Sequence, residues 1–115
     1  MNNTKYKACI IACSECATAC VSCNIASLNE ADVKMLSRCI RLTQACADIC
    51  LEAVKSMAGN SEFSKQICKL CAEICTACAI ECQKHAHMQH CKECEEACRA
   101  CAETCSSMTN AYLYA

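Results

Sequence analysis

The chain has 115 residues, a length that suits one compact domain and is too short for two. Its 11 basic and 12 acidic residues nearly cancel, so the charge gives no indication of binding to nucleic acid or to an anionic membrane. Proline is absent, glycine occurs once and only four residues are aromatic, whereas 18 are cysteine; this predicts long helices around a core in which cysteine replaces larger apolar side chains.

The first predicted helix covers residues 4–26 and carries a regular stripe of cysteines. They follow one another at steps of 4, 3, 4 and 3 residues: Cys9, Cys13, Cys16, Cys20 and Cys23. Steps that average 3.5 residues place side chains on one face of a packed helix, whereas a strand needs steps of two. The opposite face carries Ile10, Ile11, Val21 and Ile25, and an exposed apolar strip of this kind predicts a contact with another subunit.

The second predicted helix, residues 30–57, has a thinner stripe. Three cysteines follow its buried phase, Cys39, Cys46 and Cys50, and the same phase carries Thr43 between the first two. We expect Asn29 to cap the start of this helix and Gly59 to take the left-handed conformation that ends it. Because this helix offers fewer thiols, metal ions should gather nearer to the other three helices.

The third and fourth predicted helices cover residues 62–86 and 89–107, and residues 109–115 are predicted to form a tail. Their cysteines step by 3, 4, 3 and 4 residues: Cys68, Cys71, Cys75, Cys78 and Cys82 in the third helix, and Cys91, Cys94, Cys98, Cys101 and Cys105 in the fourth. Short connections make consecutive helices antiparallel neighbours. The sequence therefore predicts an all-α fold, in which one domain over residues 1–115 forms an antiparallel up-down-up-down four-helix bundle with a cysteine-lined core.

Seven pairs of these cysteines have CxxxC spacing. Such residues on a helix have Cβ atoms about 5–6 Å apart, which is farther than the roughly 3.5–4.5 Å of a relaxed disulfide. Two sulfurs at this spacing suit a metal ion in near-linear geometry, which Cu(I) accepts and Zn(II) does not. The CxxC steps between these pairs allow one sulfur to bridge two ions. We therefore expect all 18 thiols to be free and to bind multiple Cu(I) ions per chain.

The charge of the thiolates also favours Cu(I). A buried row of ionised thiolates needs positive counter-charge. One Cu(I) per thiolate neutralises the row, whereas a zinc ion held by four thiolates leaves two negative charges. The copper load should therefore approach one ion per cysteine. A zinc or mixed-metal thiolate buffer, similar in role to metallothionein, is the main alternative.

Four other interpretations account less well for the cysteines. Packing as small apolar residues suits one or two cysteines, but not 18 on inward helix faces. A disulfide scaffold would be typical of an exported protein. Iron–sulfur ligands come from loops and end in Cys-Pro, and this chain has no proline. A thiol enzyme needs one nucleophilic cysteine with a dedicated base; no cysteine stands apart in this way, so we expect no enzyme.

The start of the chain, residues 1–8, shows no apolar stretch or cleavage site of a leader. No apolar run approaches the roughly 18 residues needed to cross a bilayer. We therefore expect a cytoplasmic protein without a membrane contact, in a compartment where thiols stay reduced. The copper donor and acceptor, and the choice between copper supply and protection from excess copper, have no signal in the sequence.

One end of the predicted bundle gathers neutral ligands for Cu(I): His85, His87 and His90, with Met35 and Met88 nearby. His85 lies on the face of the third helix that carries its cysteines, and His87 lies on the corresponding face of the fourth. Both should therefore point into the mouth of the bundle if the helices extend that far. His90 lies off the cysteine face of the fourth helix. We expect these three histidines to be candidate ligands, and copper to be taken up and released at this end.

The opposite end of the predicted bundle carries no histidine. Met57 and Met108 lie there, near the last positions of the helix faces that carry the cysteines. Phe63, Ile67 and Leu70 should seal this end. Because the sides of a packed bundle are closed, exchange should occur only at the end with the histidines.

The sequence resembles the cytosolic branch of the cysteine-rich four-helix-bundle copper storage proteins. The resemblance covers about residues 8–108 and rests on CIRLTQACADIC in the second helix, on CxxCxxxCxxCxxxC in the third and fourth, and on KHAHMQHC between them. It implies Cu(I) bound along the bundle axis, a role in copper storage and homeostasis, and assembly as a homotetramer. The tail and the histidine connection depart in length from the family.

Overall fold

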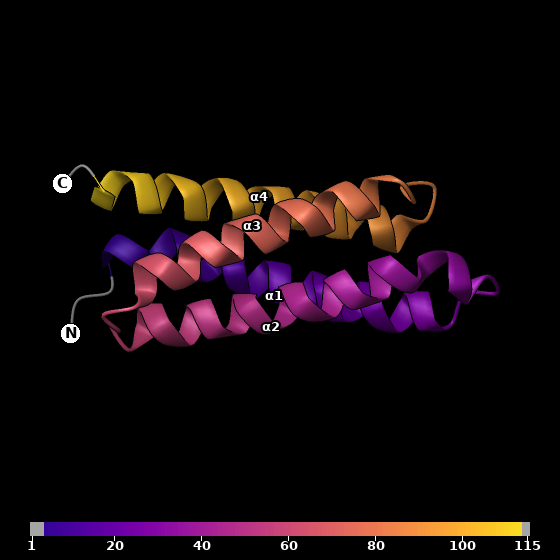
Figure 1. The fold of residues 1–115 in the computed structure, drawn as a ribbon, viewed down its shortest axis with the longest axis horizontal. Helices are drawn as coiled ribbons and strands as arrows, with labels where there is room; N and C mark the ends of the chain where they lie inside the picture. The colour runs from indigo at the N-terminus through magenta and orange to yellow at the C-terminus, as the bar shows by residue number, and fades with distance from the viewer. Residues whose placement is uncertain (1–3, 114–115) are drawn as a thin grey trace.

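The structure, a computed structural model, describes residues 4–113, and over this range it consists of helices joined by turns. Four long helices run up and down along one axis (Figure 1). In chain order the elements are the 3₁₀-helix η1 (Thr4–Tyr6), α1 (Lys7–Leu28), the 3₁₀-helix η2 (Val33–Leu36), α2 (Ser37–Ala58), α3 (Ser64–Gln83) and α4 (Gln89–Leu113). The expected all-α fold, an antiparallel up-down-up-down four-helix bundle, is confirmed.

The four long helices surround the bundle axis as a closed ring. Each packs against the next in the chain, and α1 also packs against α4. The molecule measures 48 × 22 × 18 Å. We call the end with the α3–α4 connection, residues 84–88, the histidine end, and the end with the α2–α3 connection, residues 59–63, the serine end. The α1–α2 connection also lies at the histidine end, on the right of Figure 1, whereas η1 lies at the serine end.

Cysteine makes up most of the core. All 18 cysteines are buried, and all except Cys9, which is 2% exposed, have no exposed surface. Leu36 and Met57 are the largest fully buried side chains, and small residues such as Ala53 and Ala79 lie between the sulfurs. Small side chains let the four helices approach closely, and burial of the sulfurs removes apolar surface from water. The bundle is therefore held together by residues that can also bind metal.

The connection between α1 and α2 differs from the expectation, because residues 29–36 form turns and η2 and the second helix begins only at Ser37. Asn29 terminates α1 instead of capping α2. Its backbone N–H donates to the carbonyl of Ala26 and its side-chain amide to that of Ile25, both at 3.1 Å. The side chain that was expected to start the second helix thus satisfies carbonyl groups at the end of the first.

The turn between α2 and α3 has the hydrogen bonds of a Schellman motif. The N–H of Ser61 donates to the carbonyl of Ser56 at 2.9 Å, and that of Asn60 to Met57 at 3.1 Å. Asn60 takes the left-handed conformation, with φ of 54°, whereas Gly59 has φ of −85°. The expectation for Gly59 is therefore wrong by one residue. Asparagine tolerates this conformation because its short polar side chain can form local hydrogen bonds.

The last two helices also differ in extent from the prediction. α3 ends at Gln83 instead of residue 86, and α4 continues to Leu113 instead of ending at residue 107. The predicted tail is thus helical up to residue 113, and residues 114–115 lie outside the described range. Met108 and Thr109 are buried, so α4 continues to pack on the bundle beyond its last cysteine. The early end of α3 leaves His85 and His87 in the connection.

By length and composition α1 could cross a membrane, with a mean hydropathy of 1.6 over 18 residues. This contradicts the expectation that no apolar segment is long enough. The difference arises because cysteine and alanine count as apolar, although the cysteines of α1 line the bundle interior. Core helices and leader sequences pass the same test, so the property is weak evidence for a membrane contact.

The outward face of α1 carries the expected apolar strip. Ile11, Val21 and Ile25 are 48%, 51% and 54% exposed, and Leu28 adds a fourth exposed side chain. Ile10 is partly covered. The outward face of α4, in contrast, is charged, with exposed Lys92, Glu96, Arg99 and Glu103. The strip on α1 is therefore an exposed apolar surface, unlike the charged face of α4.

Candidate metal centre

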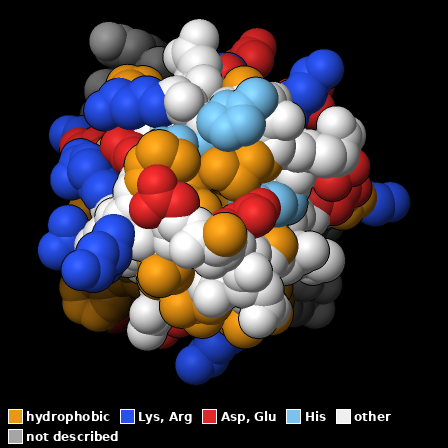
Figure 2. All heavy atoms as spheres, turned by 90° about the vertical axis from the view of Figure 1, so that its right-hand side faces the viewer, with side chains coloured by type: hydrophobic (Ala, Val, Ile, Leu, Met, Phe, Trp, Pro, Cys, Tyr) orange, Lys and Arg blue, Asp and Glu red, His pale blue; other side chains and the backbone are white. Residues whose placement is uncertain are grey.

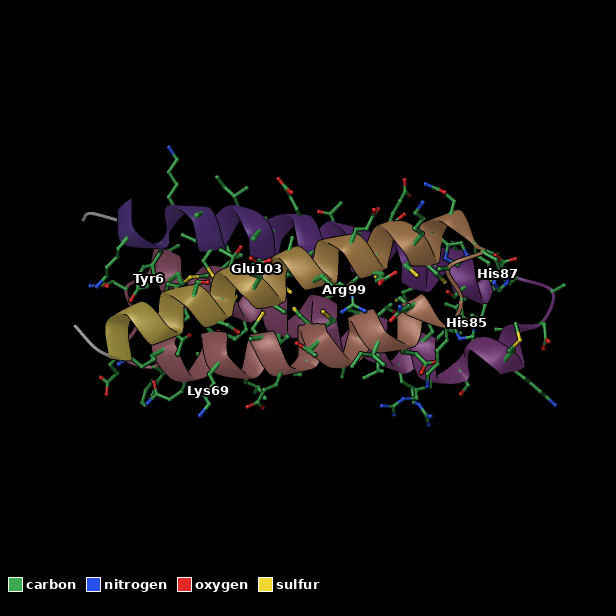
Figure 3. The ribbon with its side chains drawn as sticks, turned by 90° about the horizontal axis from the view of Figure 1, so that it is seen from above. Tyr6, Lys69, His85, His87, Arg99 and Glu103 are labelled. Atoms are coloured by element: carbon green, nitrogen blue, oxygen red, sulfur yellow. The ribbon has the colours of Figure 1, made fainter. Side chains whose placement is uncertain are left out.

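The sulfur atoms form a column along the bundle axis, visible in yellow between the helices in Figure 3. All 18 thiols are free. In the middle of the column all four helices contribute: the Sγ of Cys16 lies 3.7 Å from Cys46, 3.9 Å from Cys75 and 3.7 Å from Cys98. The cysteine stripes predicted from the spacing on the four helices thus meet at one axis.

The shortest sulfur contacts join different helices. The Sγ of Cys105 lies 3.1 Å from that of Cys9 and 3.5 Å from that of Cys13, whereas Cys16 and Cys20 on one helix are 4.0 Å apart. Antiparallel packing brings the seams of neighbouring helices together at the same height. The CxxxC pairs are therefore parts of larger groups, which spacing along one helix did not predict.

Sets of four sulfurs lie within 4.8 Å of one another along the column. Five such sets, ordered along the axis, each share two sulfurs with the next: Cys13, Cys71, Cys101 and Cys105; Cys50, Cys71, Cys75 and Cys101; Cys16, Cys46, Cys50 and Cys75; Cys16, Cys20, Cys46 and Cys98; Cys20, Cys78, Cys94 and Cys98. A sulfur that belongs to two sets can bridge two soft metal ions.

These distances would also suit a tetrahedral zinc ion, because Zn–S bonds of about 2.3 Å imply sulfurs roughly 3.8 Å apart. The sharing of sulfurs distinguishes the metals better than the distances do. Zinc in neighbouring sets would place divalent ions on either side of two shared sulfurs, where they repel one another. Monovalent ions with two or three sulfur ligands fit the same atoms with less repulsion. The column therefore favours a soft monovalent metal.

Four cysteines at the histidine end form what we call the end group: Cys23, Cys39, Cys82 and Cys91. The Sγ of Cys23 lies 3.9 Å from that of Cys91, and the Sγ of Cys39 lies 3.9 Å from that of Cys82. The remaining 14 of the 18 cysteines form the inner column. The end group contains the cysteines nearest to the histidine connection.

Hydrogen bonds and burial shift the pKa values of the end group in opposite directions. The pKa of Cys39 is lowered to about 3, because Cys23 and then Cys82 form hydrogen bonds with its thiolate. The pKa of Cys91 is raised to about 12, because burial desolvates its thiolate and the charge of Cys39 repels it. The neighbouring thiols therefore favour the anionic form of Cys39 within this group.

His90 has contacts with two sulfurs of the end group. Its Nδ1 lies 3.3 Å from the Sγ of Cys23 and 3.5 Å from that of Cys91, and its Nε2 lies 2.8 Å from Oε2 of Glu30. A carboxylate accepts a hydrogen bond from Nε2–H, which leaves the lone pair of Nδ1 available to a metal. The ring is thus held with Nδ1 against the sulfurs.

His85 and His87 lie differently from the expectation. Nε2 of His85 is 3.2 Å from Oε2 of the buried Glu81, which also forms ion pairs with Arg38 and Lys84 at 3.5 and 3.3 Å. His87 is exposed. Both belong to the connection between α3 and α4 (Figure 3) and not to a helix. The helix faces that were expected to direct them into the mouth therefore do not extend to these residues. Among the described side chains, His90 is the histidine with sulfur contacts.

The surface of the histidine end combines several kinds of side chain. Figure 2 looks onto this end and shows histidine side chains beside acidic and apolar ones. Met35 is 50% exposed, and Met88 is partly buried. Imidazole, thioether and carboxylate groups therefore lie around the outermost sulfurs.

Of the three residues expected to seal the serine end, only Ile67 packs against the core. Phe63 and Leu70 are exposed, at 56% and 46%. Met57 is fully buried, and the hydroxyl groups of Ser56 and Ser64 lie 2.9 Å apart. The side chains that close this end thus come mainly from the buried helix faces, with Ile67 packed beside them.

Several polar partners of the site were missed. Glu81 precedes His85 by four residues, a spacing that brings side chains together on a helix and could have indicated the pair. Glu30 is 60 residues from His90 in the chain, so no local pattern could have indicated that contact. Asn24 and Thr43, which are hydrogen-bonded across α1 and α2, likewise depend on how the helices pack.

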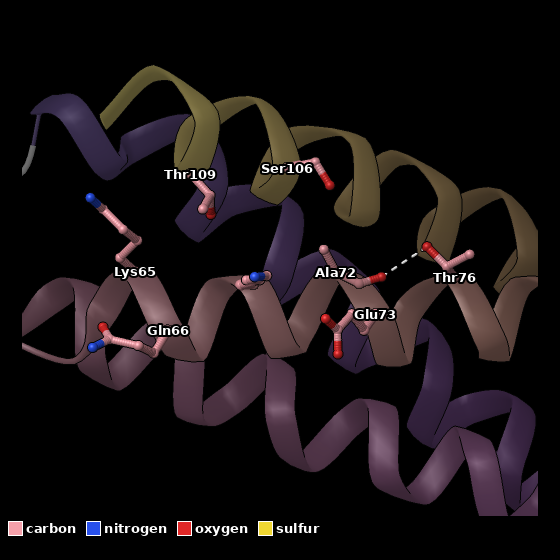
Figure 4. Close-up of a pocket in the computed structure, with 8 residues that line it drawn as sticks. Lys65, Gln66, Ala72, Glu73, Thr76, Ser106 and Thr109 are labelled. Atoms are coloured by element: carbon pink, nitrogen blue, oxygen red, sulfur yellow. Dashed lines mark hydrogen bonds between the residues drawn. The ribbon is translucent and has the colours of Figure 1, made fainter. Parts of the chain in front are cut away.

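A groove on the outside of α3 and α4 is separate from the sulfur column. It has a volume of about 550 Å³, and its lining includes Lys65, Glu73 and Thr109 (Figure 4). The Oγ1 atom of Thr109 is buried and has no hydrogen-bond partner among the described residues. No cysteine lines the groove, so it is not part of the metal centre.

The fold and the column together define a four-helix metal-binding protein whose ligands are buried thiols. A family model described as "Csp: Copper storage protein" matches residues 2–110. The chain belongs to the copper storage protein family, and the resemblance identified from its cysteine pattern is confirmed.

Individual relatives agree with this assignment. The cysteine-rich protein YhjQ of Bacillus subtilis (strain 168), described as uncharacterized, is 53% identical over 81 residues, 70% of this chain and 75% of that protein. The Cu(I)-bound copper storage protein BsCsp3, from Bacillus subtilis, has a TM-score of 0.89 and 50% identity, over 92% of this chain and 99% of that one. A cytosolic copper storage protein from Streptomyces lividans with five coppers has a TM-score of 0.88 and 35% identity, over 94% of each chain.

Proposed function

We propose that this protein stores Cu(I), with many ions per chain held by the thiolates of the 18 cysteines inside the bundle. The observation that carries the proposal is the continuous column of free, buried thiols in which neighbouring four-sulfur sets share ligands. Two relatives support it: one was solved with Cu(I) bound, and the one from Streptomyces lividans was loaded with 10 copper equivalents. Storage involves no reaction, and we propose no catalytic role.

Charge balance explains how such a core could be filled. Each thiol must lose its proton before it binds a soft metal, so every ion that enters releases protons to solvent. One Cu(I) per thiolate leaves the buried column neutral, which avoids the free-energy penalty of a buried charge. The bundle can therefore accept copper until sulfur ligands run out.

The proposed ligands outside the column are the three histidines. His90 has the best position, because Glu30 holds its ring with Nδ1 against the end group. His85 and His87 remain proposed as weaker, transient ligands of the connection. Neutral imidazole binds Cu(I) less tightly than thiolate does, so an ion that arrives at a histidine would pass on to the sulfurs.

We also propose that the protein works in the cytoplasm as a homo-oligomer. A solved relative is described as cytosolic, and free thiols persist in a reducing compartment. The exposed apolar strip on α1 would be covered by another subunit in a closed symmetric assembly. The proposed tetramer rests on the family resemblance.

Titration of the reduced protein with Cu(I), under anaerobic conditions and against a chromogenic chelator, tests the proposal. We expect binding of about 15–20 ions per chain, because neutralisation of the thiolates requires about one ion each. A parallel titration with zinc, followed by competition between the metals, should show that Cu(I) displaces zinc. Protein with alkylated thiols is the control and should bind almost no copper.

Saturation at four or fewer copper ions would contradict storage. Displacement of copper by zinc would favour the thiolate buffer instead.

A further inference from the structure

The cysteine stripe of α2 is interrupted at Thr43. This residue lies between Cys39 and Cys46 on the buried face and has no exposed surface. The two cysteines are seven residues apart, which corresponds to roughly 10 Å along a helix. For two turns, therefore, α2 brings no sulfur to the axis.

The hydroxyl group of Thr43 both donates and accepts a hydrogen bond. It donates to the carbonyl of Cys39 at 2.9 Å or of Ile40 at 3.1 Å, and it accepts from the side-chain amide of Asn24 at 3.1 Å. The same amide donates to the carbonyl of Ile40 at 2.8 Å. A hydroxyl oxygen is a poor ligand for a soft ion, and this one is already engaged.

The interruption coincides with the boundary between the end group and the inner column. Asn24 directly follows Cys23, the α1 cysteine of the end group, so its bond to Thr43 fixes the height of the interruption. The five four-sulfur sets described above consist of inner-column cysteines, and the hydrogen bonds that link the two groups, from Cys94 to Cys23 and Cys82 and from Cys78 to Cys82, involve α1, α3 and α4. The end-group contacts of 3.9 Å, in contrast, run between Cys23 and Cys91 and between Cys39 and Cys82.

We infer that Thr43, held by Asn24, divides the sulfur column into two copper compartments, an end group that exchanges ions quickly and an inner column that exchanges them slowly. An ion moves along the column when one sulfur replaces another as its ligand. At the height of Thr43 such steps depend on α1, α3 and α4 alone, because α2 offers a hydroxyl oxygen, a poor ligand for Cu(I), in place of a sulfur. The inference rests on the proposed storage of Cu(I). It adds the order in which the stored ions are exchanged, with those of the end group before those of the inner column.

Release of copper from the loaded protein tests the division. Fully loaded wild-type protein is mixed anaerobically with excess chelator, and the absorbance of the chelator–Cu(I) complex is followed. We expect two phases, with a fast phase of roughly a fifth of the copper, since the end group holds four of the 18 cysteines. Protein given two equivalents and mixed with chelator at once should release them in the fast phase, and after incubation in the slow one.

Two variants at one position separate the role of sulfur from that of packing. Thr43→Cys adds a ligand at the interruption; it should raise the capacity by about one ion and bring the slow phase several-fold closer to the fast one. Thr43→Val has a similar shape but adds no sulfur, so its two phases should persist. Far-UV circular dichroism checks that both variants remain helical.

A single phase in wild-type protein that binds many ions would overturn the division while leaving storage intact. Binding of only a few ions would instead contradict the proposed storage. If Thr43→Cys does not fold, the delay experiment on wild-type protein still decides: release that stays equally fast at every delay overturns the inference. Loss of the slow phase in Thr43→Val would also overturn it, because packing alone would then explain the barrier.

Discussion

At the serine end of the bundle, Met57 is fully buried, Tyr6 is only 8% exposed, and the hydroxyl groups of Ser56 and Ser64 are in hydrogen-bond contact. At the histidine end, by contrast, the outermost sulfurs lie beside the imidazole of His90. The seams that meet at the two ends are alike in their cysteine spacing. They differ in the residues that terminate them.

The comparison shows how one sulfur column can have one site of exchange. Buried thioether and hydroxyl groups that are packed and hydrogen-bonded leave no open ligand for an incoming ion. A mostly buried imidazole oriented by a carboxylate presents a nitrogen that an ion can reach before it binds sulfur. We therefore expect substitutions at the serine end to change stability, and those at the histidine end to change copper exchange.

The largest expected effect is on folding, at the serine end. Met57→Ala should lower the free energy of unfolding of the metal-free protein by about 2–5 kcal/mol, because it leaves a cavity at a fully buried position. Met35→Ala, at a half-exposed position of the other end, is the matched control and should cost no more than about 0.5 kcal/mol. Urea denaturation of the reduced proteins measures both. Faster copper uptake by Met57→Ala would show that the serine end can also admit copper.

The second expected effect is on copper uptake, at the histidine end. His90→Ala should slow uptake about tenfold, equivalent to about 1.4 kcal/mol in the barrier, because the oriented Nδ1 beside the end group is lost. Stopped-flow mixing with chelated Cu(I) measures the rate. His87→Ala removes an exposed imidazole from the same connection and should stay within about twofold of wild type. Equal slowing in both variants would mean that the structure places the exchange ligand wrongly.

The smallest expected effect is the dependence of the metal-free protein on alkaline pH. The folded-state pKa of Cys91 is raised from 9.0 to about 12 by burial and by the charge of Cys39. Stability from this group is therefore complete below about pH 9 and is lost as pH rises from 9 towards 12, because the unfolded chain loses the proton first. The slope is about 1.4 kcal/mol per pH unit at most. Cys91→Ser has no such proton, so its stability should decline less steeply over the same range; parallel curves would exclude this contribution.

The cysteine seams were predictable because they are a local property of the sequence. Steps of three and four residues determine a helix face whatever the neighbours do, so the placement of residues such as Cys16 and Cys98 at a common axis followed directly. The histidine connection was not predictable in the same way. The position of His85 and His87 depended on where α3 stops and α4 starts, and α3 stops at Gln83, three residues before the expected end.

Helix ends and long-range polar pairs were the parts that sequence reasoning missed. Asn29 suits either end of a helix, and packing assigned it to the end of α1. Asn60 took the left-handed position expected of Gly59, because both residues tolerate it and the hydrogen bonds of the turn select the later one. The pairing of Glu30 with His90 needed the arrangement of all four helices.

The use of cysteine as the core residue has a consequence for how the protein can fill. A cysteine side chain has a single heavy-atom torsion, and its staggered rotamers move the sulfur while the backbone stays in place. The inner sulfurs, including those of Cys16, Cys46 and Cys75, can therefore turn from one partner to another inside helices that are already formed. Occupancy can increase one ion at a time, with each new ion accommodated by small rotations and not by a rearrangement of the fold.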